Sequence, residues 1–187
     1  MITAIDKNTA LVLIDFQNAV VAAPVVHSMD KVLNNTNKLI DAFKEKKLPV
    51  IFVNVNPGNA AWVQSRKEAA MNAFPTDESL FKITDKLHAA SSDIFITKHT
   101  WNAFFETTLN EELRKRNVTG IVLAGVSTSI GVEGTARAAS ELGYNISFAL
   151  DAMSDRVEEA HERSIQYIFP RIGELGNADD IIAALSR

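Results

Sequence analysis

The sequence predicts an α/β protein: a three-layer, Rossmann-like fold in which helices cover both faces of a parallel sheet of about six strands. Short apolar, β-branched runs alternate along the chain with segments of helical periodicity, which is the pattern of βαβ units. The 187 residues, 47% hydrophobic and 22% charged, match the size and composition of one globular domain. No internal repeat or linker interrupts them, so we expect a single domain over residues 1–187.

The N-terminal part predicts two strands joined by a long helix. Thr9 to Phe16 is the first strand, because its central residues are all apolar. Ser28 to Lys47 is a helix with an apolar i, i+3, i+4, i+7 stripe and lysines opposite, and Pro49 to Val55 is the second strand. Asn56 to Thr76 contains Gly and Pro and has weak periodicity, so we expect an excursion with one short helix, a candidate lid over the site.

The remaining elements continue the alternation. The apolar residues of the helices recur three and four positions apart, and the last helix has Asn177 as a candidate cap. Predicted strands are Asp93 to Thr97, Ile121 to Ala124, Asn145 to Leu150 and a weak one at Ile172 to Leu175; predicted helices are Phe105 to Arg116, Ile130 to Leu142 (closed by Gly143), Val157 to Ile168 and Ala178 to Leu185.

Three positions fall where a parallel sheet places its ligands. Asp15 and Lys98 each end an apolar strand, and Gly131 lies in the first turn of the helix that follows the fourth strand. Each also has a plain structural interpretation. In that interpretation, Asp15 caps a loop, Lys98 is a solvated strand end, and Gly131 allows close packing, as Gly134 does one turn later.

Three sequence blocks resemble those of the isochorismatase-like hydrolases, also called the cysteine hydrolase superfamily, which includes nicotinamidases and N-carbamoylsarcosine amidases. The blocks are LVLIDFQN, IFITKHTWNAF and GVSTSIGVEGTAR, in the order of that family. The resemblance implies a sheet of order 3-2-1-4-5-6, with Asp15 as catalytic aspartate and Lys98 as catalytic lysine. The position of the nucleophilic cysteine is occupied by Gly131, and the chain contains no cysteine.

That strand order makes contact between the two charged residues feasible. Lys98 would lie two strands from Asp15, roughly 10 Å at about 4.8 Å per strand, and an extended lysine covers most of that distance. The resemblance further implies a cis peptide between Val126 and Ser127, and an oxyanion hole formed by the amides of Ser127 and Gly131. Candidate substrate contacts are Gln17, His99, Trp101 and Phe104, the last three for a flat or unsaturated substrate; packing is the equal alternative.

The resemblance implies hydrolysis without a covalent enzyme intermediate. True isochorismatases also have glycine at the nucleophile position, and there the aspartate acts as an acid while water adds to the resulting cation. Burial would raise the pKa of Asp15 and favour that role, whereas Lys98 would lower the pKa and favour a base that activates water. Ser127, Thr128 and Ser129 are weak candidate nucleophiles, since no histidine base is evident by motif and capping explains them.

We therefore expect a hydrolase that acts on a vinyl ether or an amide-like C–O or C–N bond of a small organic substrate. The alternative is a catalytically silent binding or scaffold protein that retained the fold. We expect no cofactor and no metal site, because the four histidines are scattered and the Asp-x-His motif of nicotinamidases is missing.

The charge and composition limit which binding partners and which cellular location we expect. A net charge of −4 argues against a nucleic-acid partner. No signal-peptide pattern or membrane-length apolar run is present, so with the absence of cysteine we expect a cytoplasmic protein without membrane contact. The resembled family implies a homodimer or homotetramer. His161 lies on an apolar helix face, as a core or interface residue, and Phe169 is expected to add apolar surface to that helix.

Overall fold

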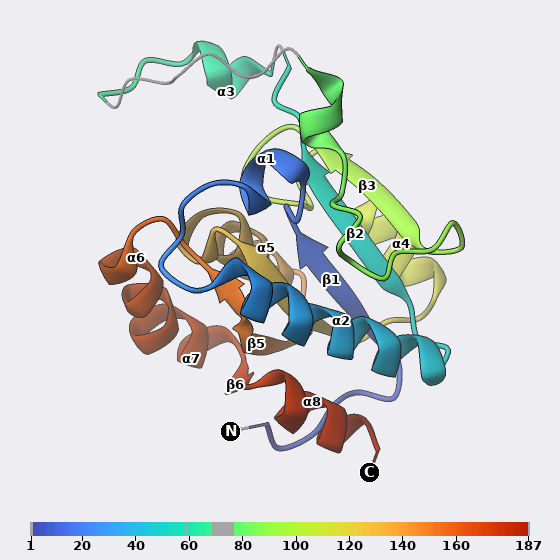
Figure 1. The fold of residues 1–187 in the computed structure, drawn as a ribbon. Helices are drawn as coiled ribbons and strands as arrows, with labels where there is room; N and C mark the ends of the chain where they lie inside the picture. The colour runs from blue at the N-terminus through green and yellow to red at the C-terminus, as the bar shows by residue number, and fades with distance from the viewer. Residues whose placement is uncertain (1, 59, 69–76, 187) are drawn as a thin grey trace.

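One six-stranded parallel sheet, in the order β3-β2-β1-β4-β5-β6, forms the centre of the molecule (Figure 1). The computed structural model describes residues 2–58, 60–68 and 77–186. The predicted fold class and strand order are confirmed. The strands are β1 Thr9–Ile14, β2 Val50–Val55, β3 Ile94–Lys98, β4 Gly120–Val126, β5 Asn145–Ser154 and β6 Glu174–Gly176.

Helices cover both faces of this sheet, because the apolar side chains of β1 point alternately to its two faces. Leu11 and Leu13 pack into a core with α2 and α8, whereas Val12 and Ile14 pack into a second core with α4, α5 and α7. The helices are α1 Asn18–Val21, α2 Met29–Glu45, α3 Ala61–Gln64, α4 Leu109–Lys115, α5 Glu133–Glu141, α6 Glu158–Arg163, α7 Phe169–Ile172 and α8 Ala178–Leu185; the 3₁₀ turn η1 is Glu78–Phe81, and the π-helical turns are η2 Thr128–Val132 and η3 Ser164–Ile168.

One predicted helix is wrong in extent, and two others are helical over nearly the predicted range but each contains a π-helical turn. The helix expected from Phe105 begins only at Leu109, because Glu106 has a φ of +53° and breaks the helical path. The helix expected from Ile130 is a π-helical turn, η2, followed by α5 from Glu133. The helix expected over Val157 to Ile168 is α6 continued by η3. Both π-helical turns insert a wider turn that periodicity does not reveal.

Other boundaries differ by a few residues. The first strand ends at Ile14 rather than Phe16, since Asp15 has a φ of +57°, and β5 extends four residues beyond the predicted Leu150. Gly143, with a φ of +85°, ends α5 as expected, and Asn177 forms a capping box with Asp180.

The predicted excursion over 56–76 contains α3, and its residues 59 and 69–76 lie outside the described part of the chain. The lid hypothesis therefore stays a prediction. Within the described ranges, no helix is both long and apolar enough to cross a bilayer.

β1 and β4 approach each other closely where they end. Gly125 has a φ of +146°, and a Cβ built on it would lie 2.3 Å from the carbonyl oxygen of Ile14. Every other residue would clash with the backbone of β1 at this point. The glycine therefore lets the turn after β4 lie directly beside the residue that follows Ile14, which is Asp15.

Candidate active site

Asp15 lies at the carboxyl end of β1 and is buried. Its positive φ turns the residue out of the strand, a conformation that aspartate tolerates better than most residues. The Oδ2 atom accepts a hydrogen bond from Lys98 Nζ at 2.8 Å. The Oδ1 atom is also buried, yet no donor among the described residues reaches it. An unsatisfied buried oxygen is costly in a folded protein, which marks it as a candidate functional atom.

The pKa of Asp15 rises from its ordinary value of 3.8 to about 6. Burial is the larger cause, because it disfavours the carboxylate; the charge and hydrogen bond of Lys98 act in the opposite direction. Of the two opposing effects expected from the sequence, burial therefore wins. An acid with a pKa near the working pH can both give and take a proton.

Lys98 is the last residue of β3 and only 1% exposed. It crosses in front of β2 to reach Asp15, as the strand order predicts, and its ammonium also donates to the carbonyl oxygen of Thr100 at 3.0 Å. These two acceptors orient the ammonium. The predicted Asp15–Lys98 contact is present.

Gly131 faces this pair from the turn that follows β4. A Cβ built on Gly131 would lie 3.0 Å from Asp15 Oδ2 and 3.6 Å from Lys98 Nζ. A side chain at this position would therefore touch both charged groups. The structure brings together the three residues that the sequence singled out, and the backbone of Gly131 leaves room beside the carboxylate.

The turn carrying Gly131 is held by residues that the sequence did not indicate. The peptide between Val126 and Ser127 is cis, as the resemblance implies. Asp155, which follows β5, accepts hydrogen bonds from the amide and the hydroxyl of Ser129 at 2.7 and 2.8 Å. A strand-end aspartate can cap any following loop, so the sequence alone gave no signal that Asp155 reaches this turn.

Thr128 in the same turn does contact a histidine. His161 Nδ1 lies 2.8 Å from Thr128 Oγ1, and that hydroxyl donates to the carbonyl oxygen of Ser154 at 3.0 Å. His161 Nδ1 must then carry the hydrogen, and Thr128 is fully buried. Burial, followed by the neighbouring His27, holds the pKa of His161 below its usual 6.5. The pair is a structural anchor, because the hydroxyl proton is already committed and the oxygen is not accessible.

The residues predicted to contact substrate lie in different environments. Gln17 is buried, and its side-chain amide donates to the carbonyl and accepts from the N–H of Val55, so it links the segment after β1 to β2. Phe104 stacks on Tyr144 in the core layer, with ring centroids 5.9 Å apart. Trp101 is 56% exposed and lies over Gly134.

His99 instead faces a cavity of about 410 Å³ that it shares with Trp62 and Phe105. Its Nδ1 lies 2.6 Å from the carbonyl oxygen of Asn56, so this nitrogen carries the hydrogen and Nε2 is the acceptor of the neutral ring. The carbonyl oxygen of His99 accepts a hydrogen bond from the indole of Trp62. The aromatic pocket expected beside Lys98 thus has a different composition from the predicted one.

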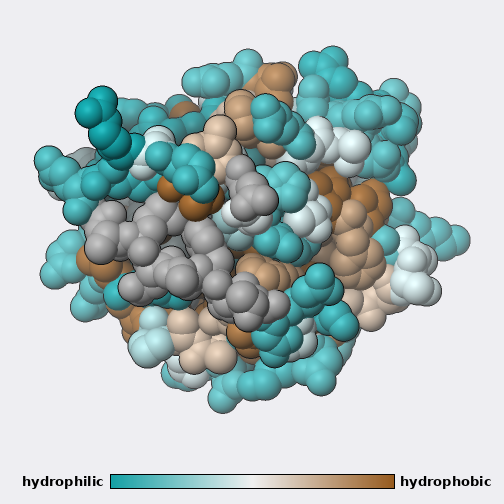
Figure 2. All heavy atoms as spheres, turned by 90° about the horizontal axis from the view of Figure 1, so that it is seen from above, coloured by the Kyte–Doolittle hydropathy of each residue, from teal (hydrophilic) through white to brown (hydrophobic). Residues whose placement is uncertain are grey.

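The expected apolar surface of the late helix is also corrected. Phe169 is fully buried and stacks on Phe148 at 3.9 Å, and His161 is a core residue. Neither side chain adds apolar surface to the exterior. The large exposed apolar residues include Trp101, Ile130 and Val157 instead. From above, the face shown in Figure 2 has brown apolar side chains that interrupt the teal polar surface.

Metal-binding groups do not gather at the site. In the described ranges, no group of three or more His, Asp or Glu side chains is placed to hold an ion. His88 pairs with Asp41 at the surface, and His27 stacks against His161 with ring centroids 4.7 Å apart.

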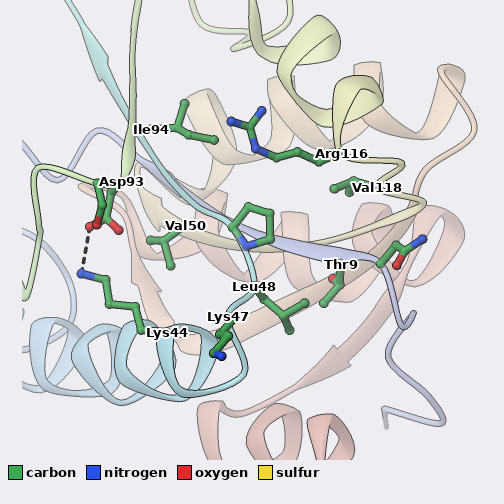
Figure 3. Close-up of a pocket in the computed structure, with 12 residues that line it drawn as sticks. Thr9, Lys44, Lys47, Leu48, Val50, Asp93, Ile94, Arg116 and Val118 are labelled. Atoms are coloured by element: carbon green, nitrogen blue, oxygen red, sulfur yellow. Dashed lines mark ion pairs between the residues drawn. The ribbon is translucent and has the colours of Figure 1, made fainter.

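A wide groove of about 740 Å³ lies at the other edge of the sheet, where β1, β2 and β3 begin (Figure 3). Thr9, Val50 and Ile94 are among the residues that line it, and Lys44 pairs with Asp93 on one side. It has no contact with Asp15 or Lys98, so this large hollow is separate from the candidate chemistry.

The parallel sheet, with the Asp15–Lys98 pair at the carboxyl ends of its strands and the turn after β4 facing that pair, has the arrangement that the resemblance to isochorismatase-like hydrolases implies. The model of the isochorismatase domain matches residues 9–180. The chain therefore belongs to the isochorismatase family and is a hydrolase.

Relatives of known sequence or structure agree with this assignment. The isochorismatase family protein YecD of Escherichia coli O157:H7 is 39% identical, over 96% of this chain and 97% of that protein. The ureidoacrylate amidohydrolase RutB of Pseudomonas syringae is 27% identical, over 95% of this chain and 84% of its own. An isochorismatase family protein of known structure from Burkholderia thailandensis is 37% identical, with 98% of both chains covered and a TM-score of 0.94.

Proposed function

We propose that the protein hydrolyses a C–O or C–N bond, in a vinyl ether or an amide-like group of a small organic molecule, with water activated by Asp15 and without a covalent enzyme intermediate. One observation carries the proposal. The buried carboxyl of Asp15 has Oδ2 fixed by Lys98 and a pKa near 6, while its buried Oδ1 meets no donor from the described residues. Such an oxygen is suited to exchange a proton with water or substrate.

For the two bond types, the carboxyl of Asp15 would act as base and acid in opposite order. With an amide-like bond, the Asp15 carboxylate removes a proton from water as the water oxygen adds to the carbonyl carbon, and Asp15 then returns the proton to the leaving nitrogen. With a vinyl ether, protonated Asp15 gives its proton to the alkene carbon, water adds to the resulting cation, and Asp15 takes a proton from that water. The hemiketal then separates into a ketone and an alcohol.

The remaining site residues have supporting roles in this proposal. Lys98 orients Asp15 and stabilises its carboxylate. Gly131 leaves space for the water where a thiol would otherwise stand, which the built Cβ, 3.0 Å from Asp15 Oδ2, supports. The amides of Ser127 and Gly131 are the proposed donors to a developing oxyanion.

The cavity beside Lys98 is the proposed place of an unsaturated or flat part of the substrate. His99, Trp62 and Phe105 line it, and Thr100 joins it to the Lys98 ammonium. Trp101, exposed over Gly134, forms the rim of the site in this proposal, whereas Gln17 and Phe104 act through packing and strand linkage.

The test is a screen of amides, ureas and enol ethers with the purified protein, its Asp15→Asn variant and an Asp93→Asn control. Asp93 is also a carboxylate paired with a lysine, but it lines the groove at the far edge. We expect turnover that survives EDTA, is lost in Asp15→Asn and is retained in Asp93→Asn. A complete lack of turnover would favour the silent scaffold, and activity removed by EDTA and restored by Zn²⁺ would contradict the metal-free mechanism.

The pH profile of kcat distinguishes the two roles of Asp15. A base must be ionised, so a rate limited by base catalysis rises as the pH passes through about 6. A rate limited by acid catalysis falls over the same range. A profile that is flat through this range would exclude Asp15 as the group that moves the proton.

The proposal includes a homodimer or homotetramer in the cytoplasm. Exposed Trp101, Ile130 and Val157 supply apolar surface for such an assembly. Light scattering that gives a mass near 20.5 kDa at micromolar concentration would contradict the oligomer, and cell fractionation tests the location.

A further inference from the structure

A shift in strand register brings Asp155 beside the turn of the active site. In the first part of the β4–β5 pair, Leu123 lies opposite Phe148, whereas Gly125 lies opposite Met153. Without the irregularity, the residue opposite Ser127 would be Ala152. The bulge advances β5 by three positions, so that Asp155 takes this place instead.

Asp155 is 2% exposed and uses both carboxylate oxygens. Oδ2 accepts from the amide of Ser129 at 2.7 Å and from its hydroxyl at 2.8 Å. Oδ1 accepts from the amides of Arg156 and Val157 at 2.7 and 3.3 Å. One buried carboxylate therefore joins the turn after β4 to the start of the segment that leads into α6. Charge-assisted bonds of this kind are among the stronger hydrogen bonds in proteins.

The turn held in this way carries Gly131, two residues beyond Ser129. We propose that Asp155 is a positioning residue, which holds the turn Ser127–Gly131 against Asp15 and Lys98. It touches neither charged residue of the site and acts through the backbone of the turn. Its catalytic meaning rests on the proposed function, because the turn supplies the proposed oxyanion amides and closes the space around Asp15.

Glu133 offers a matched comparison for a purely stabilising role. It is also a buried carboxylate near the start of α5, and it bonds Arg137, Arg163 and the hydroxyl of Ser164. These partners connect α5 to α6 and η3, and its carboxylate makes no hydrogen bond with the turn. Loss of Glu133 should lower stability while leaving the turn in place.

The test compares Asp155→Asn with Glu133→Gln by NMR of the intact protein. Asparagine replaces one acceptor oxygen with an N–H₂ group, which must then face either the donors of Ser129 or those of Arg156 and Val157. We expect the amide signals of residues 127 to 131 to shift in Asp155→Asn. Water admitted beside Asp15 should also lower the pKa of its carboxyl by roughly one unit, measured from the ¹³C shift of its side chain. Glu133→Gln should leave both readouts unchanged.

Ser129→Ala serves as a second variant. If Asp155→Asn does not fold, Ser129→Ala removes only the hydroxyl bond and should give smaller changes of the same kind. Unchanged turn amides and an unchanged Asp15 pKa in the folded variant would overturn the proposal.

None of these measurements needs a substrate, so a lack of turnover in the wild-type protein would count against the proposed function without affecting this result. Once a substrate is found, we expect Asp155→Asn to lower kcat about tenfold or more with a smaller change in KM.

Discussion

Two lysine–carboxylate pairs with nearly equal N–O distances lie at opposite ends of the strands. Lys98–Asp15 measures 2.8 Å, with side chains 1% and 8% exposed, and Lys44–Asp93 measures 2.9 Å, with side chains 30% and 7% exposed. The second pair is surrounded by partners, since Lys44 also donates to the carbonyl of His88 and Asp93 accepts from the amide of Ala90. It borders the wide groove of Figure 3.

The first pair has the opposite character. Both side chains are nearly inaccessible to solvent. One oxygen of Asp15 has no donor among the described residues, the backbone of Asp15 is in the left-handed region, and the pKa of Asp15 is raised. These are local costs that the surrounding fold must offset. Under the proposed function, the volume of a groove is a poor guide to the active site of this protein, and an unsatisfied carboxyl with a raised pKa is a better one.

Removal of the lysine from each pair should give the largest difference between them. Lys98→Ala should lower the free energy of unfolding by about 3–5 kcal/mol at pH 8, because it leaves a buried carboxylate unpaired, and should abolish turnover. The loss should be smaller at pH 5, where Asp15 can protonate. Lys44→Ala should cost about 1 kcal/mol or less, since that lysine is partly solvated. Equal losses in urea denaturation would show that the pairs do not differ.

The pH dependence of stability separates Asp15 from the rest of the protein. Its pKa is higher in the folded chain, about 6, than its ordinary 3.8, so the folded state holds this proton more tightly. The resulting stabilisation is complete below the ordinary value and is lost as the pH rises through about 6, a change of roughly 3 kcal/mol. The wild-type free energy of unfolding, taken relative to Asp15→Asn, should therefore fall between about pH 4 and about pH 7. A constant difference would contradict the raised pKa.

Gly131→Cys tests whether the buried pair is poised for chemistry. The new side chain would start 3.0 Å from Asp15 Oδ2 and 3.6 Å from Lys98 Nζ, so small shifts of Asp15 and Ile14 must accommodate it. Lys98 should favour the thiolate, and Asp15 can take up its proton. We expect the thiol to react with iodoacetamide about tenfold faster than free cysteine near pH 6, and Lys98→Ala to remove this gain. A folded variant with ordinary reactivity would make Gly131 a packing glycine.

Gly134→Ala should have the smallest effect on stability, and it tests whether Gly134 is constrained as Gly131 is. A Cβ on Gly134 would meet Trp101 at 3.6 Å, an ordinary contact, so close packing does not require glycine there. Alanine in helix α5 should raise the free energy of unfolding by about 0.5–1 kcal/mol and leave turnover intact. Destabilisation measured by thermal unfolding would show that Gly134 is constrained as Gly131 is.

The sequence predicted those parts of the molecule that follow from local pattern. Apolar runs and helical stripes located the strands and most helices, and the resemblance supplied the strand order that joins Asp15 to Lys98. Each of these depends on residues close together in the chain or on a shared motif.

The parts that were missed depend on contacts between distant segments. The π-helical turn at Thr128–Val132 and the bulge in β5 break the regular period, so Asp155 and His161 reached the active-site turn without a sequence signal. Phe104 and Phe105 are adjacent in sequence, yet one stacks in the core and the other borders a cavity. Both lie in a turn over residues 103–106 that ends at Glu106, whose positive φ is not predictable from its residue type.

The bare backbone at Gly131 also has an evolutionary consequence. Glycine codons of the form GGU and GGC become cysteine codons by one base change, so a single mutation can place a thiol against a carboxylate and an ammonium that are already in position. Under the proposed function, catalysis through a covalent intermediate and catalysis by water alone would therefore be one base change apart on this scaffold.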